Sequence, residues 1–478
     1  MTRNRLLAGA IAGVLGGSVS GLLAVPATPW PVHLPMSGVL GVLFGLGFGV
    51  RVRTAGSGLM WGQAYGILWW LAGTLTLLPL VDGRGLQWTV PAIQGSFPHL
   101  LAHMVGFGAV LGLAMHGLGR LFPFVTAACK PPAEPRVPEL VPPLVQALVV
   151  GGVGGLLGAW VFLWGIETAG FFPVVAGMVG MGSPTAGGLL HYLIGLVIAM
   201  TFALLFHRDV GGTGSALIWG MGYGVLWWIL GPLTLLPLFT HSPVLWTVEA
   251  ARANYSSLVA HLLYGAVVGW VYAVVNRLWM ILFVDSDPLS RTREGAGARS
   301  VRGVLIGQAG GILGGILFTF VMYGVGALPS VASLVGSRSP LVGVLVHFAI
   351  SILIGSSFGL LFQRQAYSPG AGMSWGLSYG VLWWLLGALT LFPALLRQPV
   401  DWSLAAVSAN YPSLIGHLCY GIGLGLLLQY LVSRYDSAWQ PGRQRDTGTP
   451  EALWAGTVLV TVILPLVLHT AAAAAPRP

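Results

Sequence analysis

Six of the eleven histidines recur at a nearly constant spacing, and imidazole is therefore the side chain best placed to do chemistry in this sequence. They form two series whose members are 158 and then 156 residues apart: His33, His191 and His347, and His103, His261 and His417. A neutral imidazole ligates haem iron and transition metals, and it also accepts or donates one hydrogen bond. We therefore treat these six residues as the candidate cofactor-binding or metal-binding set.

Each copy of the pattern supplies one histidine to its second apolar run and one to its fourth, which gives the pairs His33 with His103, His191 with His261, and His347 with His417. Runs two and four of a four-helix bundle have the same direction, so the two rings of a pair are expected at one depth, near the outer face. Small residues beside each ring leave room for a ligand. The first pair is expected to be the weakest, because His33 lies between Pro31 and Pro35.

Three functions follow from such pairs. The first is binding of haem b, or of a transition metal ion instead, with a role in membrane electron transfer to an outer-face redox partner. The second is a channel or an uncoupled transporter for a small solute or a metal ion. The third is a structural or assembly subunit of a larger membrane complex, with no cofactor, in which the histidines only bond neighbouring helices.

An aromatic motif recurs with the histidines. Trp-Gly-x-x-Tyr-Gly-x-Leu-Trp-Trp begins at Trp61, Trp219 and Trp375. Its tyrosine and its first following tryptophan are candidate lining residues of a cofactor or substrate wall: Tyr65, Tyr223 and Tyr379, and Trp69, Trp227 and Trp383. The alternative is helix packing, with the hydroxyl and indole N–H groups bonded internally.

The elements that position these residues must cross a membrane. Of the 478 residues 55% are hydrophobic and only 7% are charged, with a mean hydropathy of +0.82. This excludes a soluble or a disordered chain. The net charge of +9 comes from basic residues scattered over short connectors, so a nucleic acid partner is not expected and the lipid bilayer is.

The sequence predicts an all-α integral membrane protein of about 13 transmembrane helices. Twelve of them form three parallel four-helix repeats around a pseudo-threefold axis, and one C-terminal helix follows. The predicted segments are repeat one (1–118), a cytoplasmic linker (119–142), repeat two (143–275), a linker (276–302), repeat three (303–432), a linker (433–451), and the C-terminal helix with an external tail (452–478). Repeats two and three carry an extra outer or re-entrant piece between their first two runs.

Basic residues predict the orientation. With the N-terminus in the cytoplasm, 17 of the 22 lysines and arginines fall on the inner side and 5 on the outer side. This predicts a multi-pass protein of a prokaryotic inner membrane with an external C-terminus.

The absence of several motifs restricts the classes of transport and catalysis that the chain can carry out. We find no acidic residue well inside an apolar run, and Glu167 is expected at the outer end of one, which disfavours ion-coupled transport. There is no Walker A, HExxH or GxSxG motif, so no catalytic residue is assigned.

Overall fold

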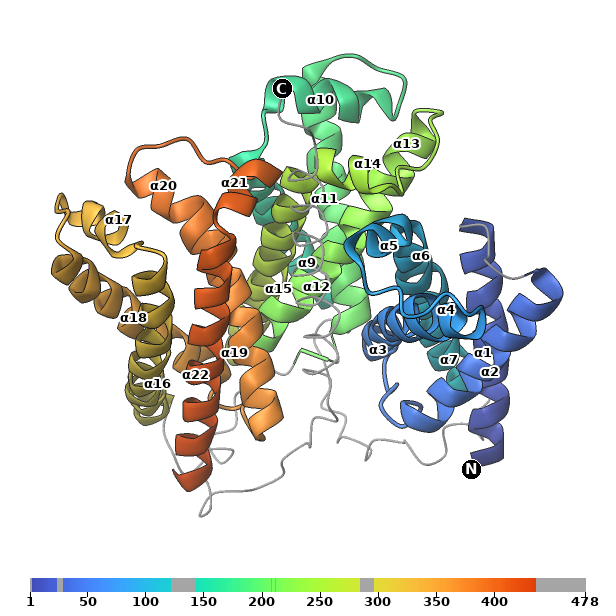
Figure 1. The fold of residues 1–478 in the computed structure, drawn as a ribbon, viewed down its shortest axis with the longest axis horizontal. Coiled ribbons are helices and arrows are strands. Elements are labelled where there is room, and N and C mark those ends of the chain that lie inside the picture. Colours follow the sequence, from blue (N-terminus) through green and yellow to red (C-terminus); the bar gives the residue numbers. More distant parts are fainter. Residues whose placement is uncertain are drawn as a thin grey trace.

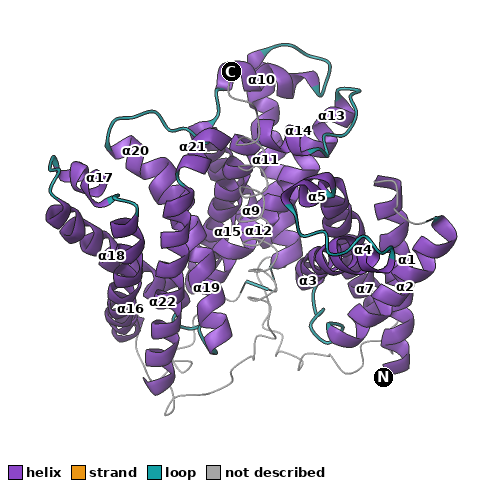
Figure 2. Cartoon of the chain, in the orientation of Figure 1, coloured by secondary structure: helices purple, strands orange, loops and turns teal. Residues whose placement is uncertain are grey.

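Every regular element in the described part of the chain is a helix. The computed structural model describes residues 2–23, 29–121, 143–207, 209–210, 212–283 and 296–435. Twelve of the described helices are long and apolar enough to cross a bilayer. The chain is therefore a multi-pass helical membrane protein, and Figure 2 shows the helices joined by short connections, most of them at one end of the molecule.

The first repeat contains four spans. Span one is α1 (Thr2–Leu23) and span two is α2 (Trp30–Gly47). Span three is α3 (Ala55–Trp69), which continues through a π-helix, η1 (Trp70–Leu77), into α4 (Leu78–Val81). After the short α5 (Val90–Gly95), span four is formed by α6 (Phe97–Leu101), the π-helix η2 (Ala102–Ala109) and α7 (Val110–Leu121).

The second repeat follows the same order with one additional helix. Its bounds are α9 (Pro143–Phe162) with the 3₁₀ turn η3 (Leu163–Gly165), α10 (Thr168–Gly177), α11 (Pro184–Phe206), α12 (Thr213–Leu230) with the π-helix η4 (Gly231–Leu235) and α13 (Leu236–Phe239), α14 (Val248–Ala253), and α15 (Tyr255–Phe283). The additional helix, α10, packs against the beginning of α11.

The third repeat has the arrangement of the second. Its bounds are α16 (Ala296–Gly324), α17 (Leu328–Ala332) with the 3₁₀ turn η6 (Ser333–Val335), α18 (Pro340–Phe362), α19 (Pro369–Trp383) with the π-helix η7 (Trp384–Leu391) and α20 (Phe392–Leu395), α21 (Leu404–Ala409), and α22 (Tyr411–Tyr435). Here α17 takes the place that α10 has in the second repeat and packs against α18.

All twelve predicted spans that fall on described residues are confirmed as helices. The additional outer pieces are the short helices α10 and α17. Helices α15 and α16 extend into the predicted linker 276–302, while most of the linkers 119–142 and 433–451 and all of 452–478, with the thirteenth predicted span, lie outside the described residues.

We call the end at which spans two and four begin the histidine end, because both histidines of a repeat lie near it. The N-terminus lies at the opposite end, which we call the N-terminal end (Figure 1). Span one packs closely against spans two and four, and span four packs against span three. Spans two and three meet through large aromatic side chains instead, such as Phe206 against Trp219 at a ring separation of 4.9 Å. The expected four-helix bundle is thus spread apart between spans two and three.

Glycines explain why spans three and four lie so close. A Cβ atom at Gly66, Gly224 or Gly380 would collide with the backbone oxygen of His103, His261 or His417 respectively. These glycines belong to the aromatic motif, so the motif brings the backbone of span three against the backbone that carries the second histidine. Close backbone approach at small residues is the usual way for helices to associate in lipid.

A tryptophan–threonine network recurs at the histidine end. The indole N–H of Trp246 donates to the hydroxyl of Thr234 (2.9 Å), which itself donates to the carbonyl of Ile229 five residues earlier (2.7 Å). Thr390 and Trp402 make the same two bonds, and so do Thr76 and Trp88. The network ties the loop after span three to the π-helical segment of that span.

This network predicts a stability difference between two matched variants. Thr234→Val leaves the buried indole N–H of Trp246 without an acceptor and should lower the free energy of unfolding by about 1–2 kcal/mol. Thr76→Val removes the same bond from Trp88, which is 60% exposed, and should cost less than about 0.5 kcal/mol. Thermal unfolding in detergent measures both, and equal losses would contradict the assigned role of burial.

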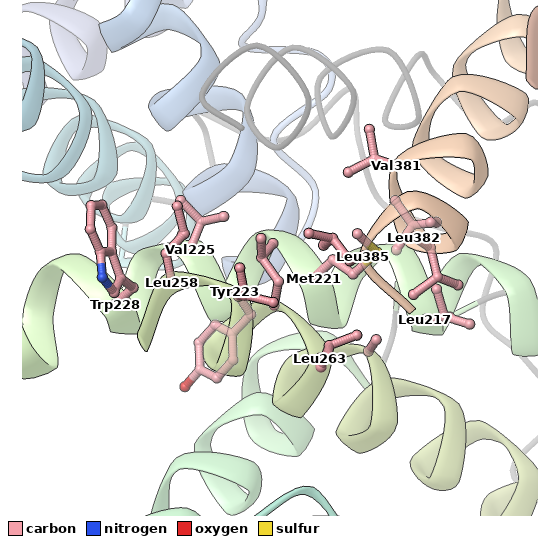
Figure 3. Close-up of a cluster of buried hydrophobic side chains, with 14 of the residues drawn as sticks. Leu217, Met221, Tyr223, Val225, Trp228, Leu258, Leu263, Val381, Leu382 and Leu385 are labelled. Carbon is pink, nitrogen blue, oxygen red and sulfur yellow. The ribbon is translucent and has the colours of Figure 1, made fainter. Parts of the chain in front are cut away.

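Successive repeats contact one another through equivalent residues. Gly56 of α3 lies against Phe206 of α11, and Gly214 of α12 lies against Phe362 of α18 in the same way. In Figure 1 the first repeat (blue) and the third (yellow to red) flank the second (green). Figure 3 shows that Val381, Leu382 and Leu385 lie beside the aliphatic face of α12, whereas the hydroxyl of Tyr223 points away from them. The hydroxyl of Tyr223 therefore faces the interior of its own repeat, where it bonds to Thr201 of span two.

Candidate functional site

The span-two histidines each bond to span one. Nε2 of His33, His191 and His347 lies 3.0, 2.9 and 3.0 Å from the carbonyl oxygen of Gly17, Ala159 and Gly315 respectively. A carbonyl oxygen only accepts, so Nε2 carries the proton and donates it. His191 and His347 are buried, at 8% and 5% exposure. Nε2 of each of these rings is thus committed to a helix–helix hydrogen bond.

The span-four histidines bond within their own helix and leave Nε2 uncommitted. Nδ1 of His103, His261 and His417 donates over 2.7 Å to the carbonyl oxygen four residues earlier. In a neutral imidazole this leaves Nε2 with a lone pair and no proton. Among the described residues Nε2 has no hydrogen-bond partner in any of the three repeats. Taken as whole residues all three are of intermediate exposure, while their imidazole groups lie deep within the repeat.

A glycine of span three lies beside that bare nitrogen. A Cβ atom placed on Gly231 would be 3.7 Å from Nε2 of His261, and at the equivalent Gly73 and Gly387 it would be 3.7 and 3.5 Å from the ring of Trp69 and Trp383. Gly231 begins its π-helix, and Gly73 and Gly387 lie within theirs. Such π-helical segments are often found at functional sites. The second repeat therefore places the imidazole nitrogen beside this glycine, whereas the first and third repeats place an indole ring there.

The two histidines of a pair converge, but on a phenyl ring. Phe162 lies with ring-centre separations of 5.3 Å from His191 and 5.0 Å from His261. Phe318 lies between His347 and His417 in the same way, at 5.2 and 4.7 Å. In the first repeat the corresponding residue is Ser20, three residues after the carbonyl that His33 contacts, as Phe162 and Phe318 are. The predicted pairs are thus neighbours, with Phe162 and Phe318 occupying the space between them.

The tyrosines of the aromatic motif are bonded to span two. Tyr65 donates to the carbonyl of Leu40 (2.7 Å), while the hydroxyls of Tyr223 and Tyr379 bond to those of Thr201 (2.6 Å) and Ser357 (2.7 Å). These bonds bridge the two spans that are spread apart. They match the packing interpretation of the motif as far as the hydroxyl groups are concerned.

The indole groups of the motif match it less well. The buried indole nitrogens of Trp69, Trp227 and Trp383 make no hydrogen bond of good geometry, but each lies near enough to the hydroxyl of its motif tyrosine for a weak one, with the ring centres 6.0–6.2 Å apart. The nitrogens of Trp61 and Trp375, two turns nearer the N-terminal end, are also buried without a partner. Span three of the first and of the third repeat thus carries two buried indole donors without a well-formed hydrogen bond, and span three of the second repeat carries one.

These groups follow one another along span three. Trp61, Tyr65 and Trp69 are four residues apart on one face of α3, so their backbone positions extend over about 12 Å. Gly73 continues the same face towards the histidine end. At the other end the guanidinium of Arg51 lies 4.8 Å from the ring centre of Trp61. We call this row, with its equivalents in the other repeats, the aromatic ladder.

The geometry limits what the paired histidines can hold. An iron atom bound by both rings of a pair requires a bare nitrogen on each, yet Nε2 of the span-two ring donates to a backbone carbonyl. In repeats two and three the phenyl ring also occupies the space between the imidazoles. Two-histidine haem ligation therefore does not fit these residue positions. Within the described residues no group of three histidine, cysteine or acidic side chains is placed to hold a metal ion.

Sequence reasoning missed the residues that separate the pairs. Phe162 and Phe318 obey the same 156-residue spacing, but the shorter connection of the first repeat conceals that Ser20 corresponds to them. Comparisons of the chain with family models, with curated proteins and with solved structures find no match.

Proposed function

We propose that the protein is an uncoupled channel for a small neutral molecule that both donates and accepts hydrogen bonds, such as ammonia or water. The path follows the aromatic ladder within a repeat, from the bare imidazole nitrogen near the histidine end to Trp61 and its equivalents. The observation that carries this proposal is the set of buried indole N–H donors on span three that make no hydrogen bond of good geometry.

Unsatisfied donors inside a membrane protein are costly. A polar group in hydrocarbon without a partner costs several kcal/mol, and an unpaired group in a native structure needs an explanation. A passing molecule satisfies such donors with its lone pair, and it satisfies the imidazole acceptor with its own hydrogen. The two indoles of the first and of the third repeat are two helical turns apart along span three with the motif tyrosine between them, so a file of small molecules, rather than one molecule, is needed to connect them.

The charge pattern favours a neutral and uncoupled solute. None of the twelve described spans contains an acidic residue, and their arginines lie near their ends. Without a carboxylate in the spans, neither a cation nor a proton-coupled step has a counter-charge there. The polar groups along the aromatic ladder are uncharged indole, hydroxyl and imidazole groups, which suit a neutral molecule.

We propose the finer architecture together with this function. The three repeats are parallel and arranged around a pseudo-threefold axis, with the thirteenth span added, in an inner membrane with the histidine end outside. The contacts Gly56–Phe206 and Gly214–Phe362 are equivalent, which supports one common symmetry operation that relates each repeat to the next. The positive-inside distribution supports the orientation.

Haem binding with electron transfer stays a prediction from the sequence. One observation favours it, namely that Nε2 of each span-four histidine is bare. It also requires Phe162 and Phe318 to leave their places. We expect detergent-purified protein that is supplied with haem to show no Soret band stoichiometric with the amount of protein. A stoichiometric band that disappears in His261→Ala would contradict the channel proposal.

The proposal is tested with the full chain in proteoliposomes that enclose a pH-sensitive dye. An ammonium chloride pulse drives ammonia inward, and the interior becomes alkaline as ammonia takes up protons. We expect faster alkalinisation than in protein-free liposomes, and osmotic shrinkage provides the corresponding measurement for water. Rates equal to those of protein-free liposomes for both molecules would refute the proposal.

A further inference from the structure

We propose that the first repeat is the conducting unit, and that Phe162 and Phe318 keep the second and third repeats closed. This inference rests on the proposed function and assigns it to one of three sites. It is carried by four differences between the first repeat and the others, all located around the paired histidines. It reverses the expectation that the first pair is the weakest.

The first difference is the side chain between the imidazoles. In repeats two and three a phenyl ring contacts both histidines, so the span-two ring has no access to the ligand position beside the span-four ring. Ser20 offers a hydroxymethyl group in the same place, and its hydroxyl is occupied by a bond to Gly17 (3.1 Å). Among the described residues no aromatic ring contacts His103. The route between the two imidazoles is therefore not blocked by a ring in the first repeat.

The second difference lies one turn further along span four. The hydroxyl of Tyr264 donates to the carbonyl of Gly195 (2.5 Å), and that of Tyr420 donates to Ser351 (2.7 Å), so a tyrosine crosses the interior of each of these repeats. Gly106 stands at the equivalent position and contacts Ser20 directly. It belongs to the π-helix η2, whereas span four is regular α-helix in α15 and α22. The first repeat thus lacks the tyrosine crossbar.

The third difference is the cover at the histidine end. Phe171 and Phe172 of α10 pack on His191, with ring-centre separations of 5.5 and 6.2 Å. In the third repeat α17 packs on the beginning of α18. In the first repeat α2 follows α1 after residues 24–29, and Trp30 at the beginning of α2 is the ring that packs on His33, at a ring-centre separation of 5.7 Å. His33 is more exposed than His191 and His347.

The fourth difference is a third imidazole. His99 stands where the other repeats have Ser257 and Ser413, and its carbonyl accepts the Nδ1 hydrogen of His103. The Nδ1 atom of His99 is itself buried and has no hydrogen-bond partner. A small molecule that enters the first repeat therefore meets one further unsatisfied polar group beside His103.

The ammonium pulse assay assigns the path to a repeat. We expect His103→Ala to bring alkalinisation down to the protein-free rate, while His261→Ala and His417→Ala leave the wild-type rate unchanged. Ser20→Phe should act like His103→Ala, and the double variant Phe162→Ser, Phe318→Ser should raise the rate. Equal losses from all three histidine variants, or no loss from His103→Ala, would overturn the inference.

A second measurement does not depend on transport. Diethyl pyrocarbonate modifies accessible imidazoles, and mass spectrometry of the treated full chain reports each site. We expect modification of His103 but protection of His261 and His417, and protection of His103 in Ser20→Phe. Selective modification without any ammonia or water flux would refute the proposed function and retain the accessible first site. Equal modification of all three histidines would refute the inference even if transport is present.

Discussion

Replacing Gly62 with leucine is expected to destabilise the first repeat more than any other single change described above. A Cβ atom at Gly62 would collide with the backbone oxygen of Gly108, so the two helices must separate before any side chain is accommodated. Such overpacking should lower the free energy of unfolding by about 3 kcal/mol, the upper end of the usual range. The loss is large because the obstacle is a backbone atom, which cannot rotate away as a side chain can. The melting temperature in detergent and the recovery of monodisperse protein on size exclusion measure this loss.

Gly117 provides the matched control. It lies on α7 of the same repeat, and a Cβ atom there would meet no atom within 4 Å. Gly117→Leu should leave the melting temperature within the error of the wild type. A comparable loss in both variants would mean that helix propensity or lipid exposure, rather than the backbone contact, decides the stability.

Leucine at Gly73, Gly231 and Gly387 together is expected to stop transport while leaving the fold intact. The nearest atoms to a Cβ at these positions are a tryptophan ring carbon or Nε2 of His261, at 3.5–3.7 Å, which is ordinary van der Waals distance. The remainder of the leucine side chain then lies against the bare imidazole nitrogen at position 231 and against the indole ring of the aromatic ladder at positions 73 and 387. Loss of one hydrogen-bonding step of about 1.4 kcal/mol lowers the rate about tenfold.

The two glycine experiments separate stability from function. The triple variant should melt close to the wild-type temperature, and its alkalinisation rate after an ammonium pulse should fall about tenfold or more. Should the triple variant fold normally and conduct at the wild-type rate, the glycine-lined position beside the imidazole is not part of the path.

The sequence predicted the membrane spans well because lipid imposes a simple rule. An apolar run of sufficient length has to be a helix in a bilayer, and twelve helices long and apolar enough to cross it are found in the described residues. The 158- and 156-residue spacings likewise place equivalent side chains at equivalent positions, as the bonds of Thr76, Thr234 and Thr390 illustrate.

The interior of each repeat could not be predicted in the same way. Whether two imidazoles on parallel helices meet depends on the residue that span one inserts between them, and Phe162 has no polar pattern that marks it. The π-helices were also missed, since their additional residue per turn leaves no signature in hydropathy. The spacing identified the histidines correctly as neighbours of one another, whereas their hydrogen bonds depend on local backbone geometry.

The aromatic ladder is tested most directly by the triple variant Trp69→Phe, Trp227→Phe, Trp383→Phe. The substitution removes three buried indole N–H groups that make no hydrogen bond of good geometry, and it retains an aromatic ring in each place. Trp160→Phe, at a tryptophan that is 55% exposed, is the control. In the ammonium pulse assay we expect the triple variant to alkalinise at the rate of protein-free liposomes and the control to match the wild type. A triple variant as fast as the wild type would contradict the central claim.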